Sequence, residues 1–182
     1  TVVQFDPLKM ASGVFRTGST ILSDDAQLIF YRDGKTASVS VTQYADARRL
    51  IATNGKTDAA INIHGKPASD EPTMALLAAL PLAMHASPEE IGVIGFGSGM
   101  STHTLLGDSR VKRVDTIEIE PAMIEGARAF GSKVERAYTD PRARLNRSDA
   151  PNREDPARGR AGSRSGAPGS ARSSAPSRRC RS

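Results

Sequence analysis

Residues 91–100 have the sequence IGVIGFGSGM, and residues 115–120, about twenty positions further on, have the sequence DTIEIE. The first stretch predicts a buried strand that runs into a glycine-rich turn, and residues 101–106 predict the first turns of a helix. The second stretch predicts another strand, which ends in carboxylates. Together these features are typical of the nucleotide-binding half of a doubly wound α/β sheet. Because the first strand is apolar at nearly every position, we expect it to be central and buried on both faces.

The glycines of this turn have different expected tasks. Gly95 and Gly97 let the backbone turn sharply and approach a ligand, and Gly99 lets the start of the helix pack closely. Glu118 follows at the distance from which a carboxylate can accept hydrogen bonds from both ribose hydroxyls. A dinucleotide fingerprint would have its third glycine where Met100 stands, so the spacing favours an adenosine-type ligand without a pyrophosphate. The alternative is a plain strand-to-helix turn that binds nothing.

The segments before this unit predict a small antiparallel sheet. Short runs rich in β-formers lie between residues 27 and 64, and Asp33-Gly34 and Asn54-Gly55 are hairpin turn signals. A helix is expected to start after Asp70 as its N-cap and to end or kink at Pro81. After the acidic strand end we expect a helix from residue 121 and one more strand from residue 143.

The last 32 residues differ sharply from the rest. Residues 151–182 contain no Val, Ile, Leu, Met, Phe, Tyr or Trp, and hold eight arginines against two acidic residues, while the whole chain has a net charge of +5. Such a segment cannot bury enough apolar surface to offset the entropy of ordering it. We expect a disordered, solvated tail; the alternative is an arm that binds nucleic acid or anionic membrane without sequence specificity.

These observations predict an α/β protein: a small N-terminal antiparallel β-domain, a partial Rossmann-like domain of the S-adenosylmethionine-dependent methyltransferase type, and a disordered tail. The expected boundaries are 1–66, 67–150 and 151–182. No apolar run approaches the roughly 18 residues of a membrane span. His64, His85 and His103 lack metal-ligand spacing, and Cys180 is the single cysteine, so we expect no metal site.

Several motifs in order resemble the spermidine synthase (polyamine aminopropyltransferase) family. They are residues 54–59 (NGKTDA), the segment 70–82 ending in LPL, residues 93–99 (VIGFGSG) and residues 114–121 (VDTIEIEP). The resemblance looks closest to bacterial spermidine synthase-like proteins that are often fused to membrane segments. It implies a small N-terminal β-domain followed by a Rossmann-like domain, and transfer of an aminopropyl group from decarboxylated S-adenosylmethionine to a polyamine.

The resemblance also implies site residues. Gly95, Gly97, Ser98, Gly99 and Glu118 would bind the nucleoside, Asp149 would lie beside the adenine, and Asp70 would lie near the amine end of the substrates. The family's next acidic strand end supplies the general base. This chain has no such segment where the base should be, so the catalytic residue is unknown and we predict little or no turnover.

Three functions therefore stay open at this stage. The first is a spermidine synthase-like chain that lacks its catalytic base, the second an S-adenosylmethionine-dependent methyltransferase, and the third a non-enzymatic nucleoside-binding fragment. The expected ligands are decarboxylated S-adenosylmethionine or S-adenosylmethionine, together with a polyamine. We expect no specific nucleic acid partner, allow for a homodimer, and expect a cytoplasmic location, with a membrane segment only in a longer parent.

Overall fold

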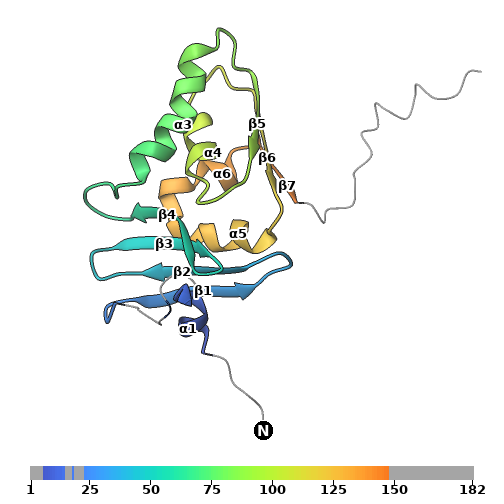
Figure 1. The fold of residues 1–182 in the computed structure, drawn as a ribbon. Coiled ribbons are helices and arrows are strands. Elements are labelled where there is room, and N and C mark those ends of the chain that lie inside the picture. The colour runs from blue at the N-terminus through green and yellow to red at the C-terminus, as the bar shows by residue number, and fades with distance from the viewer. Residues whose placement is uncertain (1–5, 15–17, 19–22, 148–182) are drawn as a thin grey trace, which may run out of the picture. The chain divides into compact units, whose positions relative to one another are not determined.

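The structure is a computed structural model that describes residues 6–14, 18 and 23–147. Asp149 and the expected tail, residues 151–182, lie outside the described residues. Figure 1 shows the element order: α1 (Pro7–Ala11), β1 (Gln27–Asp33), β2 (Ser38–Gln43), β3 (Arg48–Thr53), β4 (Lys56–Asn62), α3 (Glu71–Met84), β5 (Glu90–Ile94), α4 (Met100–Leu105), β6 (Arg113–Glu118), α5 (Pro121–Gly126), η1 (Ala127–Val134), α6 (Arg136–Thr139) and β7 (Ala143–Arg147).

The first four strands form an antiparallel sheet in the order β1-β2-β3-β4, which confirms the predicted β-part. Both hairpin signals lie in the connections between strands. Asn54 and Gly55 have φ angles of 49° and 75°, the left-handed pair that a tight two-residue hairpin turn requires. Asp33 ends β1, and the chain re-enters the sheet at Ser38.

Helix α3 begins at Glu71, with Asp70 at its N-cap position, although the Asp70 side chain makes no capping hydrogen bond. The helix is held to β4 by the buried Glu71 carboxylate, which accepts from the amides of Asn62 (2.7 Å) and Ala68 (2.9 Å). Pro81 was predicted to end or kink the helix; an end at Pro81 is wrong, since α3 continues to Met84. An interior proline removes one amide donor and its ring crowds the carbonyl four residues earlier, yet the helix continues for three residues beyond Pro81.

The second sheet has three parallel strands in the order β5-β6-β7. It confirms the predicted strand–turn–helix–strand unit, but the expected burial of its first strand is wrong. Among the residues that the structure describes, β5 is an edge strand, and the Ile94 side chain is 93% exposed. Ile91 and Val93 pack on the other face against the cluster formed by α3, α4 and β6. An apolar run looks alike in a central strand and in an edge strand, because local sequence does not report the neighbouring strand.

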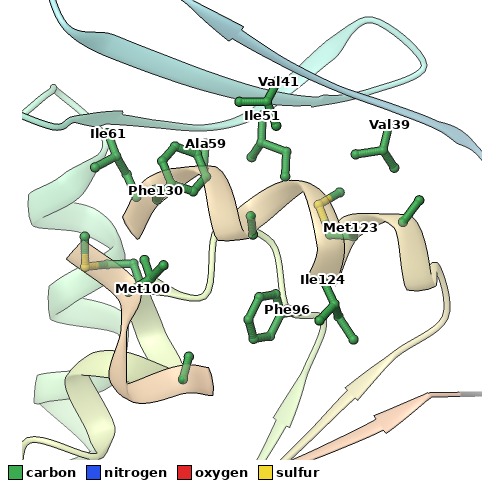
Figure 2. Close-up of a cluster of buried hydrophobic side chains, with 14 residues drawn as sticks. Val39, Val41, Ile51, Ala59, Ile61, Phe96, Met100, Met123, Ile124 and Phe130 are labelled. Carbon is green, nitrogen blue, oxygen red and sulfur yellow. The ribbon is translucent and has the colours of Figure 1, made fainter. Parts of the chain in front are cut away.

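One apolar core joins the two sheets. Figure 2 shows side chains of the antiparallel sheet facing side chains of α5 and η1, with Phe96 from the glycine turn beside Ile124. The members labelled there are Val39, Val41, Ile51, Ala59, Ile61, Phe96, Met100, Met123, Ile124 and Phe130. The expected domain boundary between residues 66 and 67 lies in the connection between β4 and α3. The core crosses that boundary, so the division into two domains stays a prediction.

Glu120 forms a polar connection at the same junction. Its buried carboxylate accepts hydrogen bonds from the Thr36 amide (2.7 Å), the Thr36 hydroxyl (2.9 Å), the Ala37 amide (3.2 Å) and the Ala122 amide (3.0 Å). Burial alone would raise the pKa of Glu120, but these donors outweigh it and lower the pKa. The carboxylate therefore caps α5 and ties that helix to the turn between β1 and β2.

Candidate nucleoside-binding site

The glycine turn follows β5 directly, at the carboxyl end of the parallel sheet. Gly95, Gly97 and Gly99 have φ angles of 83°, 53° and 83°, all in the left-handed region. Side chains rarely adopt that conformation, which explains why glycine stands at each position. A Cβ on Gly95 or Gly97 would meet nothing within 4 Å, so both backbones border open space. A ligand can therefore approach the main chain here.

Gly99 has a different constraint. A Cβ on Gly99 would lie 2.8 Å from the nearest ring carbon of Phe96, so the close packing at the start of α4 needs glycine. Ser98 lies between these glycines and is buried. Its hydroxyl contacts the Met74 sulfur (3.2 Å) and accepts from the Met100 amide (3.3 Å). The Ser98 side chain thus joins the turn to α3 and α4.

Glu118 ends β6 next to this turn, and its side chain points under it. One carboxylate oxygen accepts from the Phe96 amide (2.8 Å) and the other accepts from the Glu120 amide (2.9 Å). The residue is only 7% exposed. The structure therefore brings the glycine turn and the carboxylate at the end of β6 together, as expected. The Glu118 carboxylate also stabilises the turn by accepting the Phe96 amide, which the sequence spacing of the two did not predict.

A groove of about 570 Å³ begins at the turn and runs along β5. It is lined by Asp58 and Ala59 of β4, by Met74, Leu77, Ala78 and Pro81 of α3, by residues 91–98, and by Ser101 and Leu105 of α4. Asp58 is the single titratable side chain among these lining residues, and its carboxylate accepts from the Thr53 hydroxyl. Sequence reasoning missed Asp58, although it lies inside one of the motifs that carried the resemblance.

Of the two remaining predicted site residues, Asp70 and Asp149, the structure describes Asp70. Asp70 stands at the start of α3, where its carboxylate accepts from the Ser69 hydroxyl (3.2 Å), and it does not line the groove. The structure does not describe Asp149, so its predicted place beside the adenine stays a prediction. The described residues thus place Gly95 and Gly97 on the groove and the buried Glu118 beneath the turn, not among the lining residues, and leave Asp70 apart.

Tyr138 packs against the glycine turn through Phe96. Its ring meets Phe96 edge to face, with 5.4 Å between ring centroids, and its hydroxyl donates to the Ile124 carbonyl (2.8 Å). Burial raises the pKa of Tyr138 well above its usual value, and the nearby Arg128 guanidinium only partly opposes this. The phenol therefore stays protonated, as its donor role requires.

Within residues 6–14, 18 and 23–147, no group of three or more His, Cys, Asp or Glu side chains is placed to hold a metal ion. In the same part of the chain, no helix has both the length and the apolar character needed to cross a membrane.

The chain is similar to known aminopropyltransferases. Residues 72–152 match the family model described as the spermine/spermidine synthase domain. Two curated polyamine aminopropyltransferases, from Thermotoga neapolitana and Thermotoga maritima, are each 29% identical over 70 residues, which is 38% of this chain and 24% of theirs. The chain therefore matches about a quarter of the length of these curated relatives.

Solved structures show the same fold. The spermidine synthase from Thermotoga maritima superposes with a TM-score of 0.59 at 20% identity, over 68% of this chain and 41% of that chain. A spermidine synthase in complex with the transition state analogue AdoDATO gives a TM-score of 0.58 at 21% identity, over 66% and 40%. These findings confirm the fold class and the family resemblance that the motifs predicted; they do not bear on a fusion to membrane segments.

Proposed function

We propose that this chain, which resembles the spermidine synthase family over residues 72–152, provides the nucleoside-binding side of an aminopropyltransferase site. The observation that carries the proposal is the glycine turn lying directly above the buried Glu118 carboxylate, at the carboxyl ends of two adjacent parallel strands. Open α/β sheets bind their ligands at that end of the strands. The solved relative that holds a transition state analogue supports this choice.

The proposed ligand is decarboxylated S-adenosylmethionine. Gly95, Gly97 and Ser98 form the wall that its nucleoside approaches, because no side chain projects from Gly95 or Gly97 into the groove. Gly99 acts through the close packing of Phe96 behind this wall. Glu118 accepts the ribose hydroxyls. A carboxylate has about four acceptor sites, so the two backbone amides that Glu118 already accepts leave about two for the ribose.

Asp58 is the proposed partner of the positive charge on the ligand. The rest of the groove is apolar apart from two serines, so a cationic propylamine has one anionic group to approach there. Asp70 is the proposed contact at the polyamine end, and Asp149 the proposed neighbour of the adenine.

Aminopropyl transfer needs more than this groove offers. A neutral amine nitrogen attacks the carbon beside the sulfonium; the new C–N bond forms, the C–S bond breaks with its electron pair going to sulfur, and the amine proton passes to a carboxylate. The groove has a single carboxylate, which the ligand cation occupies. We expect that the chain by itself binds the nucleoside but transfers its aminopropyl group slowly or not at all.

The test is calorimetric titration of two ligands that differ in charge. Methylthioadenosine is neutral, whereas decarboxylated S-adenosylmethionine carries the propylamine. Asp58→Asn should raise the dissociation constant of decarboxylated S-adenosylmethionine about fivefold, as expected for the loss of one partly exposed charge pair. The dissociation constant of methylthioadenosine should not change. Asp46→Asn is the matched control, since Asp46 lies in the turn before β3 and pairs with Arg48. If Asp58→Asn weakens the binding of both ligands equally, or of neither, the proposed role of Asp58 is contradicted.

Product analysis separates the proposal from the methyltransferase alternative. Incubation with S-adenosylmethionine and a methyl acceptor mixture should yield no methylated product. If the chain binds S-adenosylmethionine and transfers its methyl group, but does not bind the decarboxylated form, the methyltransferase alternative is correct and the proposal is wrong.

A further inference from the structure

Met74 connects α3 to the glycine turn and to the start of α4. The Ser98 hydroxyl donates to the Met74 sulfur (3.2 Å), and the Ser101 hydroxyl donates to the Met74 carbonyl oxygen (3.2 Å). The Ser98 oxygen in turn accepts from the Met100 amide (3.3 Å). The thioether sulfur is therefore one of the groups that fix the Ser98 side chain, and with it the turn.

Met74 is also the methionine that lines the groove. The chain has five methionines. Met10 and Met84 are 49% and 86% exposed, whereas Met100 and Met123 are buried, at 9% and 6%. Met74 lies between these extremes, because it packs partly buried against the core and borders the groove. A small oxidant that enters the groove therefore meets a side chain whose sulfur holds the turn.

The thioether sulfur of methionine reacts with peroxides to give a sulfoxide. A sulfur lone pair attacks one oxygen of hydrogen peroxide, the O–O bond breaks, and the second oxygen leaves as hydroxide. The proton on the transferred oxygen passes to that hydroxide, so the products are the sulfoxide and water. The sulfur is oxidised by two electrons, and the peroxide is reduced. The reaction needs only access to the sulfur.

The structure has no suitable place for the added oxygen. An O–H···O hydrogen bond spans about 2.7 Å by itself, so an oxygen between the Met74 sulfur and the Ser98 hydroxyl must push the two apart. An oxygen on the other lone pair of the sulfur faces away from Ser98, toward the apolar lining of the groove or the core cluster. A polar group without hydrogen-bond partners is unfavourable there. Both epimers of the sulfoxide therefore disturb the wall of the groove.

We propose that Met74 is a modification site, at which oxidation by hydrogen peroxide weakens nucleoside binding. The inference rests on the proposed function, because the disturbed wall is the one that the nucleoside approaches. The nucleoside and the oxidant reach Met74 from the same side, so a bound nucleoside shields the sulfur. Methionine sulfoxide is reduced back by sulfoxide reductases, so the modification is reversible.

Peroxide treatment of the full chain tests the proposal. Peptide mass spectrometry locates the added oxygen, and calorimetric titration measures the affinity for methylthioadenosine. Oxidised wild type should bind at least about tenfold more weakly than the untreated protein. Met74→Leu keeps the volume of the side chain and cannot be oxidised, so its affinity should be the same before and after treatment. Met84→Leu is the matched control on the same helix and should lose affinity on treatment as wild type does.

Amide hydrogen exchange gives a readout that needs no ligand. The Phe96 amide donates to Glu118 (2.8 Å), and the Gly99 amide donates to the Phe96 carbonyl (2.9 Å). Both amides lie in the turn and should exchange faster after oxidation of the wild-type protein, because the turn has lost a support. In Met74→Leu, treatment should leave both exchange rates unchanged.

Three results overturn the proposal. The first is peroxide that oxidises Met10 and Met84 but leaves Met74 intact. The second is a Met74→Leu variant that loses affinity on treatment as wild type does. The third is oxidised Met74 with unchanged exchange at the turn. If the untreated wild-type chain does not bind methylthioadenosine, the proposed function is wrong, and exchange at the turn still tests the effect of Met74 oxidation.

Discussion

Replacing Glu120 by alanine should destabilise the protein by about 3 kcal/mol. The change removes the N-cap of α5, which costs about 1 kcal/mol and leaves the buried Ala122 amide without its acceptor. It also removes the acceptor for the Thr36 and Ala37 amides, at about 1 kcal/mol each after partial rehydration. At about 3 °C per kcal/mol, the melting temperature should fall by roughly 9 °C.

The matched control is Glu125→Ala on the same helix. Glu125 pairs with Arg32 and also links α5 to the antiparallel sheet, but the two side chains are 33% and 52% exposed. Glu125→Ala should lower the free energy of unfolding by less than about 1 kcal/mol. Urea unfolding followed by circular dichroism measures both variants. If Glu120→Ala costs no more than Glu125→Ala, the Glu120 carboxylate does not hold the junction as we argue.

The same carboxylate predicts a pH dependence. Because the folded-state pKa of Glu120 is lowered, its stabilisation is complete above the unfolded-state pKa of about 4.3 and is lost as pH falls through the folded-state value. The stability difference between wild type and Glu120→Gln should therefore shrink below about pH 4. A difference that stays constant down to pH 3, about one unit below the unfolded-state pKa, would contradict this.

Three further predictions concern the turn and its supports. Gly99→Ala should cost about 2 kcal/mol in urea unfolding, because the added methyl meets the Phe96 ring in a left-handed backbone conformation; a neutral change would refute the packing. Tyr138→Phe should cost about 1 kcal/mol by losing one buried hydrogen bond, with the edge-to-face ring contact kept. Burial and a neighbouring guanidinium lower the pKa of His103, so stability should fall as pH drops below about 6.5, and His103→Gln should flatten that slope.

Local signals were enough for most of the fold. Asn54-Gly55 marked a tight hairpin because few residues other than glycine and asparagine accept its left-handed angles. The glycine turn and the strand end at Glu118 were placed by spacing, and the parallel pairing of β5 and β6 brings them together. These features depend on backbone conformation and connectivity, which sequence patterns report directly.

Features that depend on distant contacts were not predictable in this way. The edge position of β5 depends on which strands are present beside it, and an apolar run does not carry that information. The Phe96 amide that Glu118 accepts, and the Thr36 and Ala37 donors around Glu120, come from segments far along the chain. A glutamate directly before Pro121 was a usable cap signal for Glu120. For Asp58 the only signal was its place in the motif 54–59, which does not say that its side chain lines a groove.

The most direct test of the nucleoside site compares two glycine substitutions by calorimetric titration with methylthioadenosine. Gly97 and Gly65 both have left-handed φ angles, 53° and 82°, and a Cβ on either would meet nothing within 4 Å. Each alanine should therefore cost a similar amount of stability, about 1 kcal/mol. Only Gly97 borders the groove, so Gly97→Ala should weaken binding at least about tenfold while Gly65→Ala binds like wild type. Equal affinities for both variants, or no binding by the wild-type chain, would contradict a nucleoside site at this turn.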